Sequence, residues 1–217
     1  MADYYVTVTL LNNWQYYLNY EGNNQEEVKK SFLDCLNKVE VEPTKEMQRG
    51  KDYEDLIRTC DEKDLYSRED NTINEIVNII KGGLWQEQVS KVIEVDNKQI
   101  LLFGYADVIK QNKIYDIKRV DSYHLGKYYN SVQHKIYILC TGILDFDYLV
   151  SDGKEVFVES YSITSAQKLE NEIKNKVYEF FSWLKITNLY DCYTEHWKSE
   201  EKEKLLEMEI FNDKTIL

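Results

Sequence analysis

Three consecutive stretches between residues 84 and 120 alternate apolar and polar side chains, and this pattern constrains the fold more than any other feature of the chain. The alternation predicts strands at 84–94, 99–109 and 113–120, joined by short turns at 96–98 and at Gln111-Asn112. A period of two is typical of strands that place one face on a core. The middle of the chain therefore predicts the beginning of a β-sheet.

Helical and strand patterns surround this unit on both sides. The first 20 residues alternate in a β-like manner, and a second pair of strands is expected around a turn at residues 151–153. Apolar residues recur at helical spacing in several further segments. The expected helices are 24–39, 45–60 (capped by Thr44), 72–80 (closed by Gly82-Gly83), 130–142, 165–184 and 194–210, and the expected second pair of strands is 146–150 and 155–161.

This order predicts an α/β fold in which a central mixed β-sheet of about five strands is flanked by helices. The length of 217 residues and mass of 25.9 kDa fit a single domain over residues 1–217. Its core is expected at about 45–162, followed by a helical C-terminal extension at about 164–210. No apolar run reaches about 18 residues, and the first residues carry neither a basic leader nor an apolar stretch. A cytoplasmic protein with no membrane partner is expected.

The charge balance limits how the chain could bind nucleic acid. Lys plus Arg number 27 against 39 Asp plus Glu, which gives a net charge of -12. A sequence-independent nucleic-acid coat is therefore disfavoured, because phosphate affinity comes from Lys and Arg. An enzyme that meets nucleic acid through divalent cations is still compatible, since a bound metal inverts the local charge. A locally basic stretch contains Lys118, Arg119, Lys127 and Lys135.

The four cysteines do not form a metal-binding pattern. They stand at positions 35, 60, 140 and 192 without any C-x-x-C pair, so neither a zinc site nor an iron–sulfur cluster is expected. Cys35 and Cys140 fall in apolar periodic runs and are expected to be small core residues. Four free thiols are expected in a cytosolic chain.

The stretch from Gly104 to Lys118 carries the chemistry. If Gln111-Asn112 is a two-residue hairpin loop, facing residues have numbers that sum to 223, and Asp107 faces Asp116. The two Cβ atoms would then be about 4.5–5.5 Å apart. A four-residue loop at 110–113 keeps this register, whereas a three-residue loop breaks it.

Two carboxylates facing each other on a sheet repel, and a divalent cation such as Mg²⁺ between them removes that cost. Lys118 shares this face, about 6–7 Å along the strand from Asp116. The opposite face can pack on a helix and carries Ala106, Val108, Tyr115 and Ile117. The alternative is a solvated polar face with an incidental Asp–Lys pair.

Two helices add polar residues that could converge on this face. In the helix at 45–60 an inward stripe contains Met47, Gly50, Glu54 and Ile57, where an unpaired Glu54 would be costly. Gly50 leaves room for a ligand, and the alternative role of Glu54 is a salt bridge to the sheet. In the helix at 130–142, Gln133 and Tyr137 are four residues apart and can point at one spot. Their alternative is an ordinary helix edge.

Taken together, these motifs resemble the PD-(D/E)XK nuclease superfamily, in the branch that includes RecB nuclease domains, Cas4-type nucleases and phage-type exonucleases. The motifs are G-x-x-x-E from Gly50 to Glu54, G-x-x-D from Gly104 to Asp107, D-x-K from Asp116 to Lys118, and Q-x-x-x-Y from Gln133 to Tyr137. The resemblance covers about residues 45–140. It implies the restriction-endonuclease-like version of the α/β fold.

The resemblance also implies a role for each motif residue. Glu54, Asp107, Asp116 and the backbone carbonyl of Ile117 would hold one or two Mg²⁺ or Mn²⁺ ions. Lys118 would orient or help to deprotonate the attacking water and stabilise charge on the phosphate. The DNA strand or the lysine would be positioned by Gln133 and Tyr137. The reaction implied is metal-assisted phosphodiester hydrolysis.

Some features depart from the wider family. The cysteines of its iron–sulfur members are missing, so a cluster-free protein is expected. Glu54 stands where many RecB-like members carry histidine, which favours the phage-type exonucleases. His124 and His134 flank the site and are interpreted as phosphate contacts or surface residues.

The leading hypothesis is a metal-dependent DNA nuclease, an exonuclease acting at ends or on single strands in a bacterial or phage-infected cell. One alternative is a catalytically silent relative that binds DNA or a partner protein. Another is a structure-specific endonuclease such as a junction resolvase. Expected partners besides DNA are a second copy of the chain or a recombination or replication protein.

Overall fold

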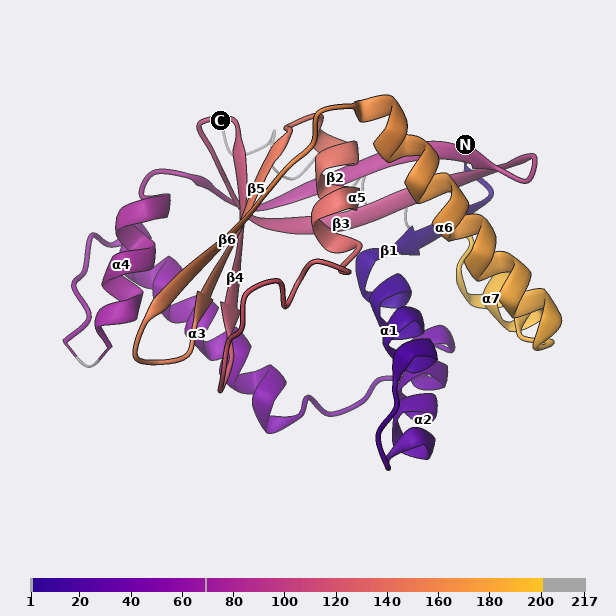
Figure 1. Cartoon of the computed structure of the whole chain (residues 1–217), viewed down its shortest axis with the longest axis horizontal. Helices are drawn as coiled ribbons and strands as arrows, with labels where there is room; N and C mark the ends of the chain where they lie inside the picture. The colour runs from indigo at the N-terminus through magenta and orange to yellow at the C-terminus, as the bar shows by residue number, and fades with distance from the viewer. Residues whose placement is uncertain (1, 69, 201–217) are drawn as a thin grey trace. The chain divides into compact units, whose positions relative to one another are not determined.

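The computed structural model describes residues 2–68 and 70–200, and Figure 1 shows their secondary structure. The elements are β1 (Tyr4–Thr7), α1 (Val8–Asn19), α2 (Gln25–Leu36), α3 (Lys45–Glu62), α4 (Asn71–Ile80), β2 (Leu84–Val95), β3 (Lys98–Lys110), β4 (Lys113–Arg119), α5 (Gln133–Thr141), β5 (Asp145–Ser151), β6 (Val156–Ser162), α6 (Ala166–Ile186) and α7 (Tyr190–His196).

The strands form one mixed sheet. Its order is β1-β3-β4-β5-β6, and β2 pairs with β3. The pairs β1/β3 and β4/β5 are parallel, whereas β3/β4 and β5/β6 are antiparallel. The prediction of an α/β fold with a mixed sheet among helices is confirmed. The sheet has six strands instead of about five, because β1 at the N-terminus joins it.

The described residues fall into two compact units. The terminal unit comprises the described residues within 1–40, 90–104 and 167–217, and the central unit comprises those within 41–89 and 105–166. Strands β2 and β3 each continue from one unit into the other. All the predicted site residues belong to the central unit. The expected organisation as a single domain stays a prediction.

The core of the central unit forms where α3 and α4 pack on one face of the β3–β4 hairpin. Val108 and Ile117 supply the strand side of this core, as the alternation of the sequence predicts. The buried members are Tyr53, Ile57, Cys60, Ile73, Ile76, Val77, Ile80, Val108, Ile117 and Leu149. Each methylene removed from water contributes about 0.8 kcal/mol, so this cluster holds α3 and α4 on the hairpin.

The turn between β3 and β4 confirms the predicted register. Val108 faces Tyr115, Ile109 faces Ile114, and Lys110 faces Lys113, so each pair of numbers sums to 223. Gln111 and Asn112 form the two-residue loop with φ of 49° and 61°. A type I′ turn requires positive φ at both central residues, and its twist matches that of the strands it joins.

The N-terminal segment differs from the expected β pattern. Only Tyr4–Thr7 is a strand, and α1 begins at Val8. The Thr7 hydroxyl caps this helix by accepting from the Leu10 N–H at 3.2 Å. Val8, Leu11 and Trp14 are spaced three apart and all buried, which is a helical face that the alternation at the very start of the chain conceals.

Two other helix boundaries also differ from prediction. Helix α2 ends at Leu36, because Lys38 takes a left-handed φ of 53°, and Val39 is therefore 51% exposed instead of inward. Helix α7 is Tyr190–His196, so the helix expected from 194 has already ended before Lys198, which bridges to Tyr4. The rest of that expected helix, from 201 to 210, lies outside the described residues.

The predicted core role of two cysteines is only partly correct. Cys35 and Cys140 are half-buried, whereas Cys60 is fully buried.

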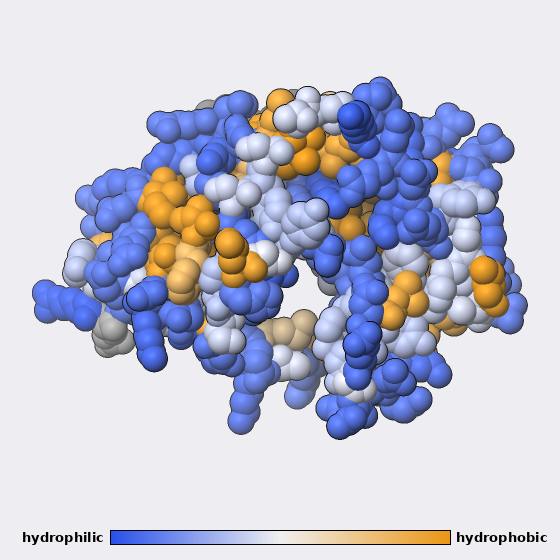
Figure 2. All heavy atoms as spheres, viewed as in Figure 1, coloured by the Kyte–Doolittle hydropathy of each residue, from blue (hydrophilic) through white to orange (hydrophobic). Residues whose placement is uncertain are grey.

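Among the residues described, no helix combines the length and apolar character needed to span a bilayer. Hydrophilic side chains cover much of the face seen in Figure 2, in line with the net charge of -12.

A close approach at Gly83 gives a test of this packing. A Cβ at position 83 would lie 2.4 Å from Val108 Cγ1 and 3.0 Å from the Ile80 carbonyl oxygen. We expect Gly83→Ala to lower the free energy of unfolding by about 1–3 kcal/mol. Gly50 in α3 is the matched control, because nothing lies within 4 Å of its Cβ position.

Gly50→Ala should raise the free energy of unfolding by about 0.5–1 kcal/mol through helix propensity. Urea denaturation of both variants measures the difference. Equal stabilities for the two variants would contradict the close packing of Gly83 on β3.

Candidate active site

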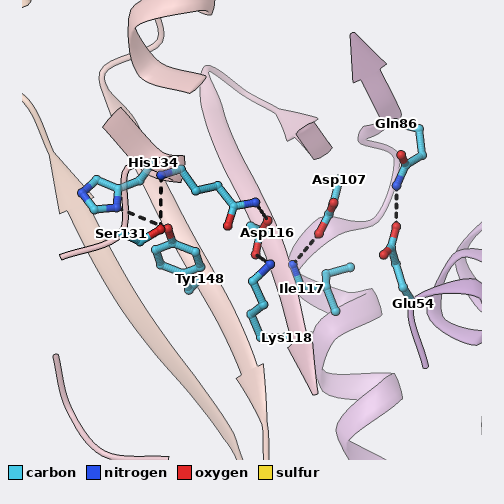
Figure 3. Close-up of polar contacts among 10 residues, drawn as sticks. Glu54, Gln86, Asp107, Asp116, Ile117, Lys118, Ser131, His134 and Tyr148 are labelled. Carbon is cyan, nitrogen blue, oxygen red and sulfur yellow. Dashed lines mark hydrogen bonds and ion pairs between the residues drawn. The ribbon is translucent and has the colours of Figure 1, made fainter. Parts of the chain in front are cut away.

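Asp116 is the most buried polar residue of the predicted set. Its side chain on β4 is 1% exposed, and both of its oxygens face donors of the protein. The Gln133 side-chain amide donates to Oδ1 at 2.5 Å. Lys118 Nζ lies 2.5 Å from Oδ2 (Figure 3). The two donors come from the first residue of α5 and from the same strand, so the start of α5 lies beside Asp116.

Asp107 lies where the β3–β4 ladder opens. The last paired residues in this direction are Val108 and Tyr115, one step before Asp107 and Asp116. The N–H of Ile117 donates to Asp107 Oδ2 at 2.8 Å (Figure 3). The Asp107 carboxylate thus accepts a hydrogen bond from the backbone of the neighbouring strand, beyond the last paired residues of the ladder. The predicted position of Asp107 beside Asp116 follows from the turn register.

Glu54 comes from α3, the helix that packs on the other face of the hairpin. It is half-buried, and its carboxylate accepts a hydrogen bond from the Gln86 side-chain amide (Figure 3). Ile57, one turn later, is fully buried, whereas Met47 is 64% exposed. Met47 was expected on the inward stripe, but it lies two turns before Glu54 in the first turn of α3, beyond the part of the helix that the core covers.

The charges of these groups act on one another. Burial, and then the charge of Asp116, raise the pKa of the Asp107 and Glu54 carboxyls, and burial also raises the pKa of Asp116. Burial opposes the charged form of Lys118, but the carboxylates of Asp116 and Asp107 outweigh it and raise the pKa of this lysine. Lys118 therefore stays an ammonium ion and acts as the counter-ion of the group.

Gln133 and Tyr137 both lie toward Asp116, as their spacing predicts. Tyr137 is 5% exposed, so it is not at an exposed helix edge, and its hydroxyl is hydrogen-bonded to Gln133. Burial and the negative charges of Asp116 and Asp107 raise the pKa of this phenol. Gln133 therefore contacts both the phenol and the carboxylate.

The residue types suit a hard divalent cation, since carboxylate and carbonyl oxygens are the donors that Mg²⁺ prefers. Three carboxyls with raised pKa values are also groups that a cation would stabilise in their charged form. Among the residues of 2–68 and 70–200, however, no group of three or more His, Cys, Asp and Glu is arranged to hold a metal ion. The ligand roles of Glu54, Asp107, Asp116 and Ile117 therefore stay predictions.

Sequence reasoning missed Gln86 and Tyr148. Gln86 precedes the motifs by many residues, and nothing in its neighbourhood indicates that it reaches Glu54. Tyr148 on β5 is fully buried, and β5 pairs in parallel with β4 so that Tyr148 is the partner of Asp116. That parallel pairing joins residues 32 apart, and it could not be deduced from local patterns.

His134 was interpreted as a phosphate contact or a surface residue, and the structure contradicts a surface position. Its side chain is 2% exposed and stacks on Tyr161 with ring centroids 4.1 Å apart. The imidazole Nδ1 lies 3.3 Å from the Tyr148 hydroxyl. Burial, and then the charge of Lys135, lower the pKa of His134 to about 4. The residue is a neutral core histidine in an aromatic cluster.

Comparison with known proteins gives distant structural likenesses only. No protein-family model matches the chain, and no curated protein is significantly similar in sequence. The structure of an alkaline exonuclease, LHK-Exo, in complex with dAMP has a TM-score of 0.49 and 15% identity, and the match covers 92% of this chain and 94% of that one. The crystal structure of the alkaline exonuclease LHK-Exo from Laribacter hongkongensis has a TM-score of 0.42 and 13% identity, with 84% of this chain and 91% of that one covered. The crystal structure of SSO0001 has a TM-score of 0.44 and 13% identity, with 84% and 79% covered.

The burial of His134 predicts a pH-dependent stability. In the unfolded chain the His134 imidazole binds a proton near pH 6.5, whereas in the folded chain it is protonated only near pH 4. Because the unfolded state binds more protons between these values, the free energy of unfolding falls as the pH is lowered from 6.5 to 4. We expect the wild type to lose about 2 kcal/mol more than His134→Phe between pH 6.5 and 4.5, at about 1.36 kcal/mol per pH unit. Urea denaturation at several pH values measures this, and parallel curves for the two proteins would refute the assignment.

Proposed function

We propose that this chain is a metal-dependent DNA nuclease of the PD-(D/E)XK superfamily, and that it acts as an exonuclease at ends or on single strands. The observation that carries the proposal is the buried Asp116 carboxylate, held between Lys118 and Gln133. The Asp107 carboxylate accepts a hydrogen bond from the backbone N–H of Ile117, the residue after Asp116. Residues of three of the four motifs, G-x-x-D, D-x-K and Q-x-x-x-Y, thus contact one another.

The cation would be Mg²⁺ or Mn²⁺, one or two ions, held by Glu54, Asp107, Asp116 and the carbonyl of Ile117. When bound, such an ion polarises a phosphoryl oxygen, lowers the pKa of a bound water and stabilises the leaving oxygen. The donor set supports this choice because all its members are hard oxygen ligands. An iron–sulfur cluster is not part of the proposal.

The role of Lys118 follows from its electrostatic surroundings. Its pKa is raised by Asp116 and Asp107 against the effect of burial, so at neutral pH the side chain carries a full positive charge. Its side chain is 31% exposed, so the side chain is partly open to solvent although its ammonium group pairs with the buried Asp116. A fixed positive charge in a partly desolvated site stabilises the negative charge that develops on the phosphate during hydrolysis.

Gln133 and Tyr137 would position the DNA strand or Lys118. Gln133 holds one oxygen of Asp116, which leaves the other oxygen to Lys118. Tyr137 is buried and hydrogen-bonded to Gln133, so it fixes the orientation of that amide. Together they keep Asp116 in one position, and the lysine is held through that carboxylate.

A silent relative that binds DNA or a partner protein is the second candidate. It is favoured by the internal hydrogen bonds of the carboxylates: Asp107 accepts from Ile117, Asp116 from Gln133, and Glu54 from Gln86. A carboxylate that already has protein donors is less dependent on a cation. The net charge of -12 favours a protein partner over DNA for such a relative.

Cleavage assays distinguish these candidates. With end-labelled linear DNA and Mg²⁺ or Mn²⁺, we expect the wild type to degrade DNA and EDTA to abolish the reaction. Asp116→Asn and Lys118→Met should lower the rate by at least about 100-fold, because each removes a charge that acts in the transition state. The absence of cleavage with every cation, together with retained binding of DNA or a protein, would favour the silent relative.

Lys113→Met is the matched control for Lys118→Met. Lys113 lies on the same strand, is similarly exposed at 34%, and pairs with Asp147 at 2.9 Å. Its removal should leave cleavage within about twofold of the wild type, because its ammonium group pairs with Asp147, which is not one of the proposed site residues. An equal loss in both lysine variants would argue that general charge, not the site, is responsible.

The shape of the substrate tests the exonuclease assignment. We expect linear DNA, single- or double-stranded, to be degraded while covalently closed circles survive under the same conditions. Cleavage of circles at a comparable rate would overturn the exonuclease proposal in favour of an endonuclease or resolvase.

A further inference from the structure

The side chain of Gln86 makes a contact that no motif predicts. It lies on β2, and its amide donates to Glu54 Oε1 (Figure 3). The two residues come from α3 and from the strand that follows α4, 32 positions apart in the chain. Gln86 is exposed, so its amide does not need this hydrogen bond to be satisfied, whereas the acceptor Glu54 is half-buried.

The backbone at Gln86 takes a strained conformation. Its φ is +51°, in the left-handed region, although the residue lies inside a strand and is not glycine. Such a conformation is unfavourable for a residue other than glycine and persists only where the surroundings impose it. Gln86 differs in this respect from Asp96-Asn97 and Gln111-Asn112, the two left-handed pairs at the ends of β3, which form hairpin turns.

Helix α3 holds the segment around Gln86 from one side. The Trp85 indole N–H donates to Asp61 Oδ2 at 2.8 Å, and the Gly82 N–H lies 3.4 Å from Asp61 Oδ1. Asp61 is seven residues after Glu54, two turns along the same side of the helix. Helix α3 therefore holds Trp85 through Asp61 and accepts the hydrogen bond of the Gln86 amide through Glu54.

Strand β3 holds the same segment from the other side. Gly83 packs so closely on Val108 that a Cβ would lie 2.4 Å from its Cγ1. Lys110 Nζ donates to the Ile79 carbonyl at 2.7 Å. Val108 directly follows Asp107. The segment from Ile79 to Gln86 is thus fixed to the helix that carries Glu54 and to the strand that carries Asp107.

We propose that Gln86 is a positioning residue that orients the Glu54 carboxylate toward the divalent cation without neutralising it. This inference rests on the proposed function. An amide is suited to the task because it donates a hydrogen bond but brings no charge, so the carboxylate keeps its full attraction for a cation. A lysine or arginine there would compete with the metal. Groups that orient metal ligands affect metal affinity about 10–100-fold.

The test is Mn²⁺ binding by calorimetry with the full chain in the absence of DNA. We expect Gln86→Ala to weaken Mn²⁺ binding about 10-fold and to shift the Mg²⁺ requirement for DNA cleavage upward by a similar factor, with the rate recovering at high Mg²⁺. Gln88→Ala is the matched control, being the same substitution two residues along β2, and should bind Mn²⁺ like the wild type.

Gln86→Gly separates the amide from the backbone strain. Glycine adopts the left-handed conformation without cost, so this variant should unfold at least as high in temperature as the wild type. If the amide matters, it should nevertheless bind Mn²⁺ as weakly as Gln86→Ala. Wild-type Mn²⁺ affinity in the glycine variant would overturn the positioning role.

The wild type distinguishes a failure of this inference from a failure of the proposed function. If wild-type protein binds no Mn²⁺ and cleaves no DNA, the proposed function fails and this inference fails with it. If the wild type binds Mn²⁺ and cleaves, but Gln86→Ala does so with unchanged affinity and Mg²⁺ requirement, only the inference on Gln86 is overturned.

Discussion

The candidate site depends on the burial of one carboxylate, that of Asp116. A carboxylate with 1% of its surface exposed is costly to keep charged, and the central unit meets that cost with Lys118 on one oxygen and Gln133 on the other. These two donors come from β4 and from the start of α5. The lysine and the glutamine are therefore arranged around a single charge.

The position of that charge is set by the turn before it. Gln111-Asn112 imposes a register in which residues that sum to 223 face each other, and a shift by one residue would turn Asp116 to the apolar side. The same register places Val108 and Ile117 on the opposite side, against α3 and α4. Packing of one face and chemistry of the other thus follow from one short loop.

Glu54 is tied to this arrangement by a different route. Its helix packs on the apolar face of the hairpin, and its carboxylate accepts from Gln86, a strained residue held between α3 and β3. Local strain of this kind is often found at functional sites, where the surrounding structure compensates for it. The carboxyls of Glu54 and Asp107 both have a raised pKa, and the charge of Asp116 contributes to each, so the three groups respond to one another.

Local patterns were sufficient to predict most of the helices and strands and the register of the hairpin. They also predicted the side of β4 on which Asp116 and Lys118 lie. These features follow from side-chain periodicity and from turn chemistry between near neighbours. They failed at Val8–Asn19, where a helix follows a short strand. They also failed at His134 of α5, which packs on Tyr148 of β5 and Tyr161 of β6. Only the tertiary structure decided the parallel pairing of β4 with β5 and the contact of Gln86 with Glu54. Those contacts join residues about 32 positions apart, and the packing that brings such residues together leaves no periodic trace in the sequence.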